Sequence, residues 1–314
     1  MADPSVVALL EENMREEHAA IAQYLYHAFR LQGDLRADLE EIAREEMRHL
    51  QWLAEALAAE GRPPVMERGD VTWEASSAAE ALRLNAGLEE RAVASYQQAA
   101  RAVSDPALRL LFERIAADER VHARTFAEMA ELAEAMGLAL HPRPEEVETA
   151  GLSAEELAQD IALLAADLRL EYTVILQYVY QAFVVKDCKL SRTLLEDQGQ
   201  ESMKHMGWLA EAIVDLGGLP VLEAGPINPA TDQEEILVLN LRLEHEAHDQ
   251  YARHLELLRH PRAREALGRI FEQESFHIRQ FALLQEASAG TAAPQRPSEW
   301  PRLTVGSLLG QRQW

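Results

Sequence analysis

A Glu-x-x-His pattern occurs twice in the first half of this chain, and the second half repeats the arrangement. The pairs are Glu46 with His49 and Glu119 with His122, and a lone glutamate precedes each pair, at Glu17 and Glu89. The second half has Glu171, His205, Glu244, Glu274 and His277, but Ser202 stands where the first half has Glu46. Four carboxylates and two imidazoles from four helices form the ligand set of a two-metal site inside a helix bundle. The sequence therefore predicts an all-α fold with two fused four-helix bundles.

The two halves align over their whole length with an offset near 155 residues. Gln23-Tyr24 matches Gln177-Tyr178, and the string from Met47 to Trp52 matches the string from Met203 to Trp208. This spacing indicates duplication of a complete domain, since short structural repeats have periods of 20–50 residues. We predict one bundle over residues 1–140, a second over 152–286, and a flexible tail over 287–314.

Turn and capping signals divide each half into four helices. Breaks are expected near Gly33-Asp34, Ser104-Asp105, Lys186-Asp187 and His260-Pro261. Asp-Pro steps and capping boxes predict helix starts at Asp3, Ser77, Asp105, Ser153 and Thr231. The short turns make consecutive helices antiparallel neighbours. The longer segments 61–76 and 217–230 have room to run along a bundle.

The spacing places the first four glutamates in one layer. Glu17 lies 16 residues before Gly33 and Glu46 lies 13 after it, so both are about 20 Å from the turn. Glu89 and Glu119 flank the next short turn by 15 and 14 residues. Buried carboxylates repel one another unless cations hold them. Carboxylate and imidazole ligands without thiolates suit iron or manganese. The alternative is that these side chains face water on Glu-rich helices.

The second half departs from the complete ligand set. Ser202 cannot replace a bridging carboxylate, and the neighbouring Glu201 is turned about 100° away on a helix. His248 lies one turn after Glu244 and could supply a new ligand. We expect this half to bind one metal ion strongly, or none.

Charge and cysteine content exclude several classes of function. The net charge is −23, which argues against nucleic acid or an anionic membrane as partner. The one cysteine, Cys188, allows no disulfide within the chain and no iron–sulfur site. The N-terminal residues lack the features of a signal peptide, and no segment has the length and apolarity of a membrane span. A cytoplasmic location is expected.

Both halves resemble the ferritin-like superfamily, with the closest local similarity to bacterioferritin and rubrerythrin-type bundles. The resemblance rests on the strings around Glu17, Glu46, Glu89 and Glu119 and covers about residues 5–286. It implies a diiron centre in which Glu46 and Glu119 bridge the metals, Glu17 and Glu89 are terminal ligands, and His49 and His122 bind one iron each. It also implies that Tyr24 lies near the metals and can donate an electron.

The implied reaction is oxidation of Fe²⁺ by O₂ or H₂O₂, for iron storage or detoxification. A rubrerythrin-like peroxidase needing an external electron donor, a dimanganese catalase and a non-catalytic iron-binding protein remain alternatives. In bacterioferritin a Met between the second-helix Glu and His ligates haem, so Met47 and Met203 are candidate haem ligands. Core packing is the other interpretation of these methionines. A homo-oligomer is also left open.

The C-terminal tail has an apolar cluster after a segment containing three prolines. The string Leu303-Thr-Val305-Gly306-Ser307-Leu308 resembles the cargo-loading peptides of encapsulin nanocompartments. The resemblance implies an encapsulin shell protein as partner and a location inside that shell. The alternative is a tail that packs on its own bundle.

Overall fold

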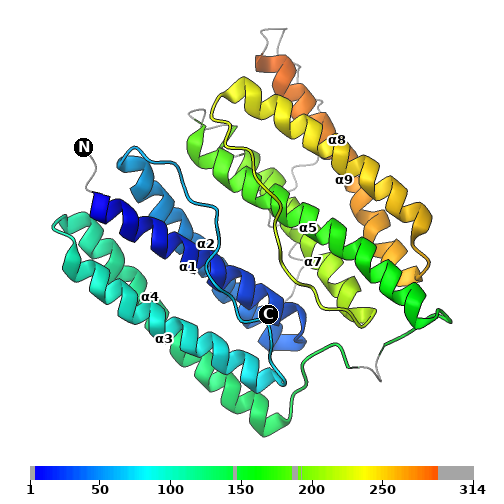
Figure 1. Ribbon diagram of the computed structural model, residues 1–314, viewed down its shortest axis with the longest axis horizontal. Coiled ribbons are helices and arrows are strands. Elements are labelled where there is room, and N and C mark those ends of the chain that lie inside the picture. Colours follow the sequence, from blue (N-terminus) through cyan, green and yellow to red (C-terminus); the bar gives the residue numbers. More distant parts are fainter. Residues whose placement is uncertain (1–3, 144–146, 186–189, 192, 289–314) are drawn as a thin grey trace, which may run out of the picture.

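The structure is a computed structural model that describes residues 4–143, 147–185, 190–191 and 193–288. All regular elements in these residues are helical (Figure 1). The first half contains α1 (Pro4–Phe29), α2 (Gly33–Ala59), α3 (Ala78–Ala102) and α4 (Pro106–Met136). The second contains α5 (Ala154–Val184), η2 (Thr193–Gly199), α7 (Gln200–Asp215), α8 (Gln233–Leu257) and α9 (Pro261–Ser288). The predicted all-α fold with two bundles is confirmed.

The helices pack in consecutive pairs, as the short turns predicted. α1 packs on α2, α3 on α4, α5 on α7, and α8 on α9. In Figure 1 the α1–α2 and α5–α7 pairs lie in the middle, and the other two pairs lie outside them. Contacts of α1 with α7 and of α2 with α5 join the halves. Segments 60–77 and 216–232 run along their bundles (Figure 1).

Capping side chains start three helices, α3, α4 and α5, where the sequence predicted them. Ser77 accepts from Glu80 N at 3.1 Å, Asp105 accepts from Ala107 N at 2.7 Å, and Ser153 forms a capping box with Glu156. The predicted cap at Thr231 is wrong by one residue. Asp232 caps α8 instead, because its carboxylate accepts from both Glu234 N and Glu235 N. The signals at Asp3 and Lys186-Asp187 lie outside the described residues.

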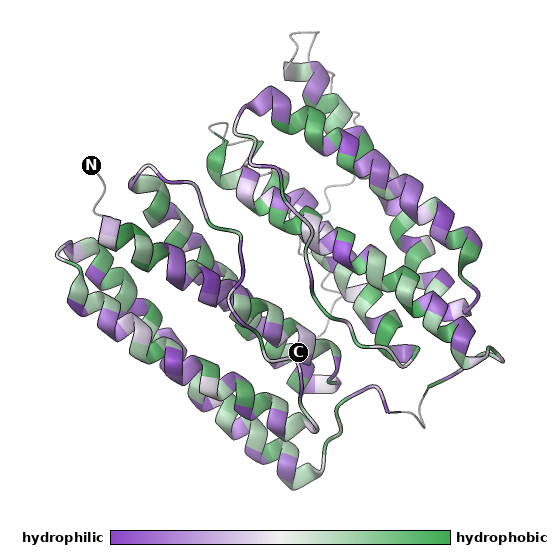
Figure 2. Cartoon of the chain, in the orientation of Figure 1, coloured by the Kyte–Doolittle hydropathy of each residue, from purple (hydrophilic) through white to green (hydrophobic). Residues whose placement is uncertain are grey.

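Apolar stripes on the helices pack into a core that extends through both halves. Figure 2 shows apolar and polar residues alternating along each helix. Leu53 and Phe126 of the first half, and Leu209 and Ile270 of the second, are fully buried in one cluster. Each such side chain stabilises the fold by about 1.5–3 kcal/mol. Within the described part of the chain, no helix combines the length and apolarity needed to cross a bilayer.

The second helical region of the second half contains a π-helical segment, η2, directly before α7. Its counterpart, α2, begins as a regular α-helix. Glu171 and His205 are 34 residues apart, whereas Glu17 and His49 are 32 apart. A π turn takes up an additional residue while the helix continues, so η2 accounts for one of these two residues. The ligand positions keep their places although the second half is longer here.

Candidate metal centre

Six side chains from four helices converge inside the first bundle, and we call them the first cluster. They are Glu17 of α1, Glu46 and His49 of α2, Glu89 of α3, and Glu119 and His122 of α4, none more than 3% exposed. Their ligand atoms form two groups, each within 4.8 Å. One group contains Glu17 and His49, the other contains Glu89 and His122, and both contain Glu46 and Glu119.

The two shared carboxylates each face both histidines. His49 Nδ1 lies 2.8 Å from Glu46 Oε2 and 3.0 Å from Glu119 Oε1. His122 Nδ1 lies 2.8 Å from Glu46 Oε1 and 3.0 Å from Glu119 Oε2. Each carboxylate thus presents one oxygen to each imidazole, which is the arrangement expected of ligands that bridge two metal ions.

The side chains of the first cluster cannot all satisfy one another by hydrogen bonding, but a pair of metal ions would satisfy them. An imidazole Nδ1 carries at most one hydrogen, yet His49 Nδ1 faces two carboxylate oxygens within 3.0 Å. Glu46 Oε1 and Glu119 Oε1 are buried and make no hydrogen bond, although a histidine nitrogen lies near each. Buried unpartnered carboxylate oxygens are costly, and a metal ion between these atoms would satisfy them.

Protons balance the charge of the first cluster in the absence of metal. Burial raises the pKa of Glu17 and Glu89, and the charges of Glu119 and Glu46 add to the effect. Burial opposes ionisation of Glu46, but the neighbouring imidazoles of His122 and His49 prevail and lower its pKa to about 2. Burial also opposes the charge on His122, but the neighbouring carboxylates of Glu119 and Glu46 raise its pKa to about 11. Metal binding would displace these protons.

Tyrosines hold the two terminal carboxylates in a reciprocal arrangement. Tyr24 of α1 donates to Glu89 of α3 at 2.5 Å, and Tyr96 of α3 donates to Glu17 of α1. The structure thus places Tyr24 against the first cluster. The role of Tyr96 was not predicted, but its position seven residues after Glu89 puts both on one helix face.

Two further carboxylates contact the outer nitrogens of the histidines. Glu45 Oε2 lies 2.8 Å from His122 Nε2, and Asp118 Oδ2 lies 3.5 Å from His49 Nε2. Such partners fix the tautomer and ring orientation of metal-binding histidines. Sequence reasoning missed both residues. Their signal is weak: each directly precedes a predicted carboxylate ligand.

The second bundle brings together five of its six predicted ligands, all except His248, and we call these five the second cluster. One group contains Glu171, His205 and Glu274, and the other contains Glu244, Glu274 and His277. Only Glu274 is shared, because the buried Ser202 occupies the position of Glu46. His205 Nδ1 lies 3.1 Å from Glu171 Oε1 and 3.2 Å from Glu274 Oε1.

His277 is held more loosely in the second cluster. Its Nδ1 lies 3.6 Å from Glu244 Oε2 and 3.7 Å from Glu274 Oε1. The tyrosine contacts are retained: Tyr178 donates to Glu244, and Tyr251 donates to Glu171 at 2.8 Å.

The surroundings of the second cluster differ from those of the first. Gln273, at the position of Asp118, faces His205 Nε2 at 3.0 Å. Glu201, at the position of Glu45, is paired with Lys204 at 2.5 Å. The acidic partners of the first cluster are thus replaced by a neutral amide and a neutralised carboxylate.

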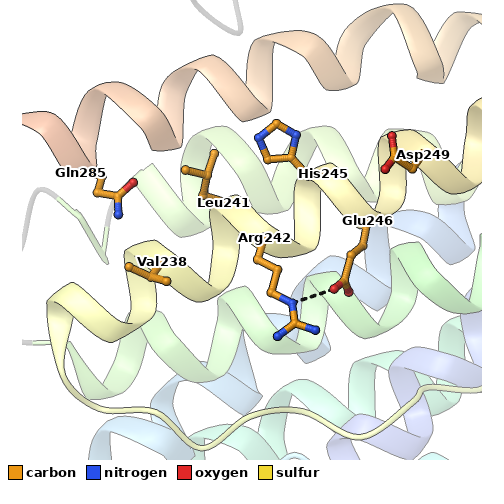
Figure 3. Close-up of a pocket in the computed structure, with 7 residues that line it drawn as sticks. All are labelled: Val238, Leu241, Arg242, His245, Glu246, Asp249 and Gln285. Atoms are coloured by element: carbon orange, nitrogen blue, oxygen red, sulfur yellow. Dashed lines mark hydrogen bonds and ion pairs between the residues drawn. The ribbon is translucent and has the colours of Figure 1, made fainter.

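The structure places the other predicted residues apart from the two clusters. His248 belongs to neither group of ligand atoms; its side chain is 31% exposed and stacks on Phe271, with ring centroids 4.4 Å apart. Met47 and Met203 are half-buried and pack against the common core. His245 lines a surface pocket on α8 and α9, where Arg242 pairs with Glu246 at 2.7 Å (Figure 3). Leu303, Val305, Gly306, Ser307 and Leu308 lie outside the described residues.

Comparison with known families agrees with this architecture. Two family models, both described as a ferritin-like domain, match residues 8–132 and residues 161–288. The chain therefore belongs to the ferritin-like superfamily and carries two such domains in tandem.

Solved structures similar to the chain include the Mycobacterium tuberculosis bacterioferritin BfrA, with 23% identity and a TM-score of 0.39. That match covers 43% of this chain and 89% of the other chain. A second structure of BfrA from M. tuberculosis has 23% identity and a TM-score of 0.38. This match covers 44% of this chain and 89% of the other chain. Comparison with curated proteins gave no significant match.

Proposed function

We propose that the first half binds two Fe²⁺ ions and oxidises them with O₂ or H₂O₂, as a ferroxidase serving iron storage or detoxification. The main support is that Glu46 and Glu119 belong to both groups of ligand atoms in the first cluster. Glu17 and His49 would complete one metal position, and Glu89 and His122 the other.

The reaction needs little covalent chemistry from the protein. Two Fe²⁺ ions each lose one electron, and the pair of electrons reduces O₂ to H₂O₂, or H₂O₂ to two waters, with uptake of two protons. The carboxylates of the first cluster neutralise the added charge on the oxidised ions. Tyr24 holds Glu89 in place through its hydroxyl.

The test is to mix anaerobic protein with Fe²⁺ and O₂ and follow the appearance of Fe³⁺. We expect fast oxidation in the wild type and its loss in Glu46→Ala. Ser202→Ala is the matched control, because it changes the equivalent position of the second half and should leave the first cluster intact. Oxidation no faster than in buffer, or equal rates in wild type and Glu46→Ala, would contradict the proposal.

A dimanganese catalase is the second candidate, because a carboxylate and imidazole ligand set without thiolates suits manganese as well. Metal analysis of the purified protein and the release of O₂ from H₂O₂ distinguish the two. Peroxide consumption that requires an added electron donor would instead indicate a peroxidase. Bound iron without any turnover would indicate a non-catalytic iron-binding protein.

For the second half we propose one bound metal ion at most. The second cluster has a single shared carboxylate, Glu274, and two groups of three ligands. Four tightly bound ions per chain, two in each half, would contradict this asymmetry. Haem ligation by Met47 and Met203 stays a prediction, and expression with haem supplied should give a Soret band if it is correct.

We also propose that the chain is cargo of an encapsulin shell, targeted by residues 303–308. The support is the sequence of the tail and the many copies of a shell subunit, which make a weak docking peptide effective. Deletion of residues 302–314 should abolish co-purification with a co-expressed shell protein. Unchanged co-purification would exclude this role for the tail. A homo-oligomeric state also remains a prediction.

A further inference from the structure

The inner face of α5 carries two buried carboxylates that the first half lacks. Asp160 and Asp167 are both fully buried, in addition to Glu171 of the second cluster. The equivalent positions of α1 are Val6 and Asn13. Buried carboxylates are costly unless they are paired, so each requires an explanation.

Asp160 has a structural role. Its carboxylate accepts from Arg259 N at 3.0 Å and from His260 N at 2.7 Å. It therefore satisfies backbone N–H groups at the turn between α8 and α9. These hydrogen bonds stabilise the buried carboxylate and account for its presence.

Asp167 is only partly satisfied. Its Oδ1 accepts from Gln250 Nε2 at 2.8 Å and lies 2.8 Å from His254 Nδ1. Its Oδ2 is buried and has no hydrogen-bond partner. The first half has Ser95 at the position of Gln250 and Ala99 at the position of His254. The carboxylate and both of its partners are thus specific to the second half.

One member of this pair is partly exposed, and the other lies one helical turn from a ligand of the second cluster. The His254 side chain is 15% exposed, whereas Asp167 is fully buried. Asp167 precedes Glu171 by one helical turn, about 6 Å along the axis. Tyr251, on the same helix as His254, donates to Glu171. His254 is thus the partly exposed member of the pair, and Asp167 links it to the α5 turn that carries Glu171.

We propose that Asp167 and His254 form a transit site for a divalent cation of the Fe²⁺ or Mn²⁺ class on its way to the second cluster. The unpartnered Oδ2 and an imidazole nitrogen are suitable ligands for such ions. Two protein ligands leave the remaining positions to water, so binding is weak enough for the ion to pass on. A purely structural ion pair would leave Oδ2 unexplained. The proposal requires that the second cluster takes up metal, but not that the first half is a ferroxidase.

The first test measures how fast the full chain takes up Mn²⁺ when no other metal is present. Uptake is monitored as the decrease of the EPR signal of free Mn²⁺. Glu274→Ala identifies the uptake phase that belongs to the second cluster. Asp167→Asn, which introduces the first half's own residue, should slow that phase about tenfold, because negative charge on the route of a cation raises association rates by 10–10³. An unchanged rate overturns the proposal, and so does the lack of any phase sensitive to Glu274→Ala.

The matched control is His248→Ala, which removes another histidine of α8 that stacks on Phe271. It should leave the second-cluster phase unchanged; equal slowing in this variant would overturn the specific role of Asp167. Far-UV circular dichroism and the rate of Fe²⁺ oxidation by the first half verify that Asp167→Asn is folded. Failure of the ferroxidase proposal would appear in that oxidation rate alone.

The second test locates the ion directly. Wild-type crystals soaked in Mn²⁺ alone should show an anomalous peak between Asp167 Oδ2 and His254, and Asp167→Asn crystals should lack it. Peaks at the second cluster in both crystals show that the soak reached the bundle. A filled second cluster without a peak at Asp167 in the wild type overturns the proposal.

Discussion

His18 of α1 and Tyr172 of α5 occupy equivalent positions in the two halves and meet across their boundary, with His18 Nε2 2.5 Å from the Tyr172 hydroxyl. Both side chains are buried. Arg68 lies beside them and donates to Leu222 O at 2.5 Å. A symmetric pair of identical subunits would place the same residue on both sides. Here the duplication has produced a donor and an acceptor of different chemistry.

The burial of His18 makes stability depend on pH. Burial, together with the charge of Arg68, lowers the pKa of His18 from 6.5 to about 4. In the unfolded chain His18 binds a proton below pH 6.5, but in the folded chain it binds one only below about pH 4. The contribution of neutral His18 to the free energy of unfolding is therefore fully present above pH 6.5 and is lost as the pH falls from 6.5 to 4. The loss is on the order of 3 kcal/mol. Urea unfolding of metal-free protein should show a shallower pH dependence in His18→Gln.

The surface variant His245→Gln is the control for that experiment. It should keep the pH dependence of the wild type. Equal slopes for His18→Gln and the wild type between pH 6.5 and 4 would refute the assignment.

Restoring the missing carboxylate should increase the number of metal ions bound by the second half. Ser202→Glu places an acid where Glu46 stands in the first half, next to His205 and His277. We expect about one additional tightly bound ion per chain, because a second bridging carboxylate completes the ligand set. Metal content after Mn²⁺ loading and gel filtration measures the change. Ser202→Gln has the same size without the charge and should give no gain.

Removing the outer partner of His49 should weaken metal binding by the first cluster. Asp118→Gln introduces the residue that the second half uses at Gln273. Loss of such a contact typically lowers metal affinity 10–100-fold, and we expect about tenfold here because Asp118 is partly exposed. Titration with Mn²⁺ checks this. The exposed Glu41→Gln on α2 is the control, and an equal effect in both variants would count against a specific contact.

Loss of the Tyr24 hydroxyl should destabilise the metal-free protein more than the loaded one. In Tyr24→Phe, Glu89 stays buried without its donor, which costs about 1–3 kcal/mol. A metal ion bound to Glu89 would replace that hydrogen bond and reduce the difference. Chemical unfolding with and without Mn²⁺ measures both values. If Mn²⁺ leaves the difference unchanged, Glu89 is not a ligand. Tyr178→Phe, at the equivalent position, should be rescued less.

The fold and the ligand layer follow from periodic features of the sequence. The distances of Glu17 and Glu46 from Gly33 place them at one height, because helix rise is constant. The duplication marks Ser202 as the one changed ligand position. These features are local or depend on simple helix geometry, so they can be predicted without coordinates.

The contacts that could not be predicted from the sequence depend on how the helices pack against one another. Glu45 and Asp118 are acidic residues on Glu-rich helices, and only the rotation of the packed helices shows that they contact histidines. The contact of His18 with Tyr172 requires the two bundles to be placed against each other. Asp232 replaces Thr231 as the cap because a carboxylate reaches two backbone groups at once.

Because the two halves are joined in one chain, a substitution can change the interior of one half without changing the other. In a dimer of identical subunits every substitution appears twice, so Ser202, Gln273 and His254 would each have altered both interiors. In the fused chain, one interior can change while Glu46, Asp118 and Ala99 remain in the other. Every molecule also carries the two clusters in a fixed one-to-one ratio, whatever its concentration or state of assembly.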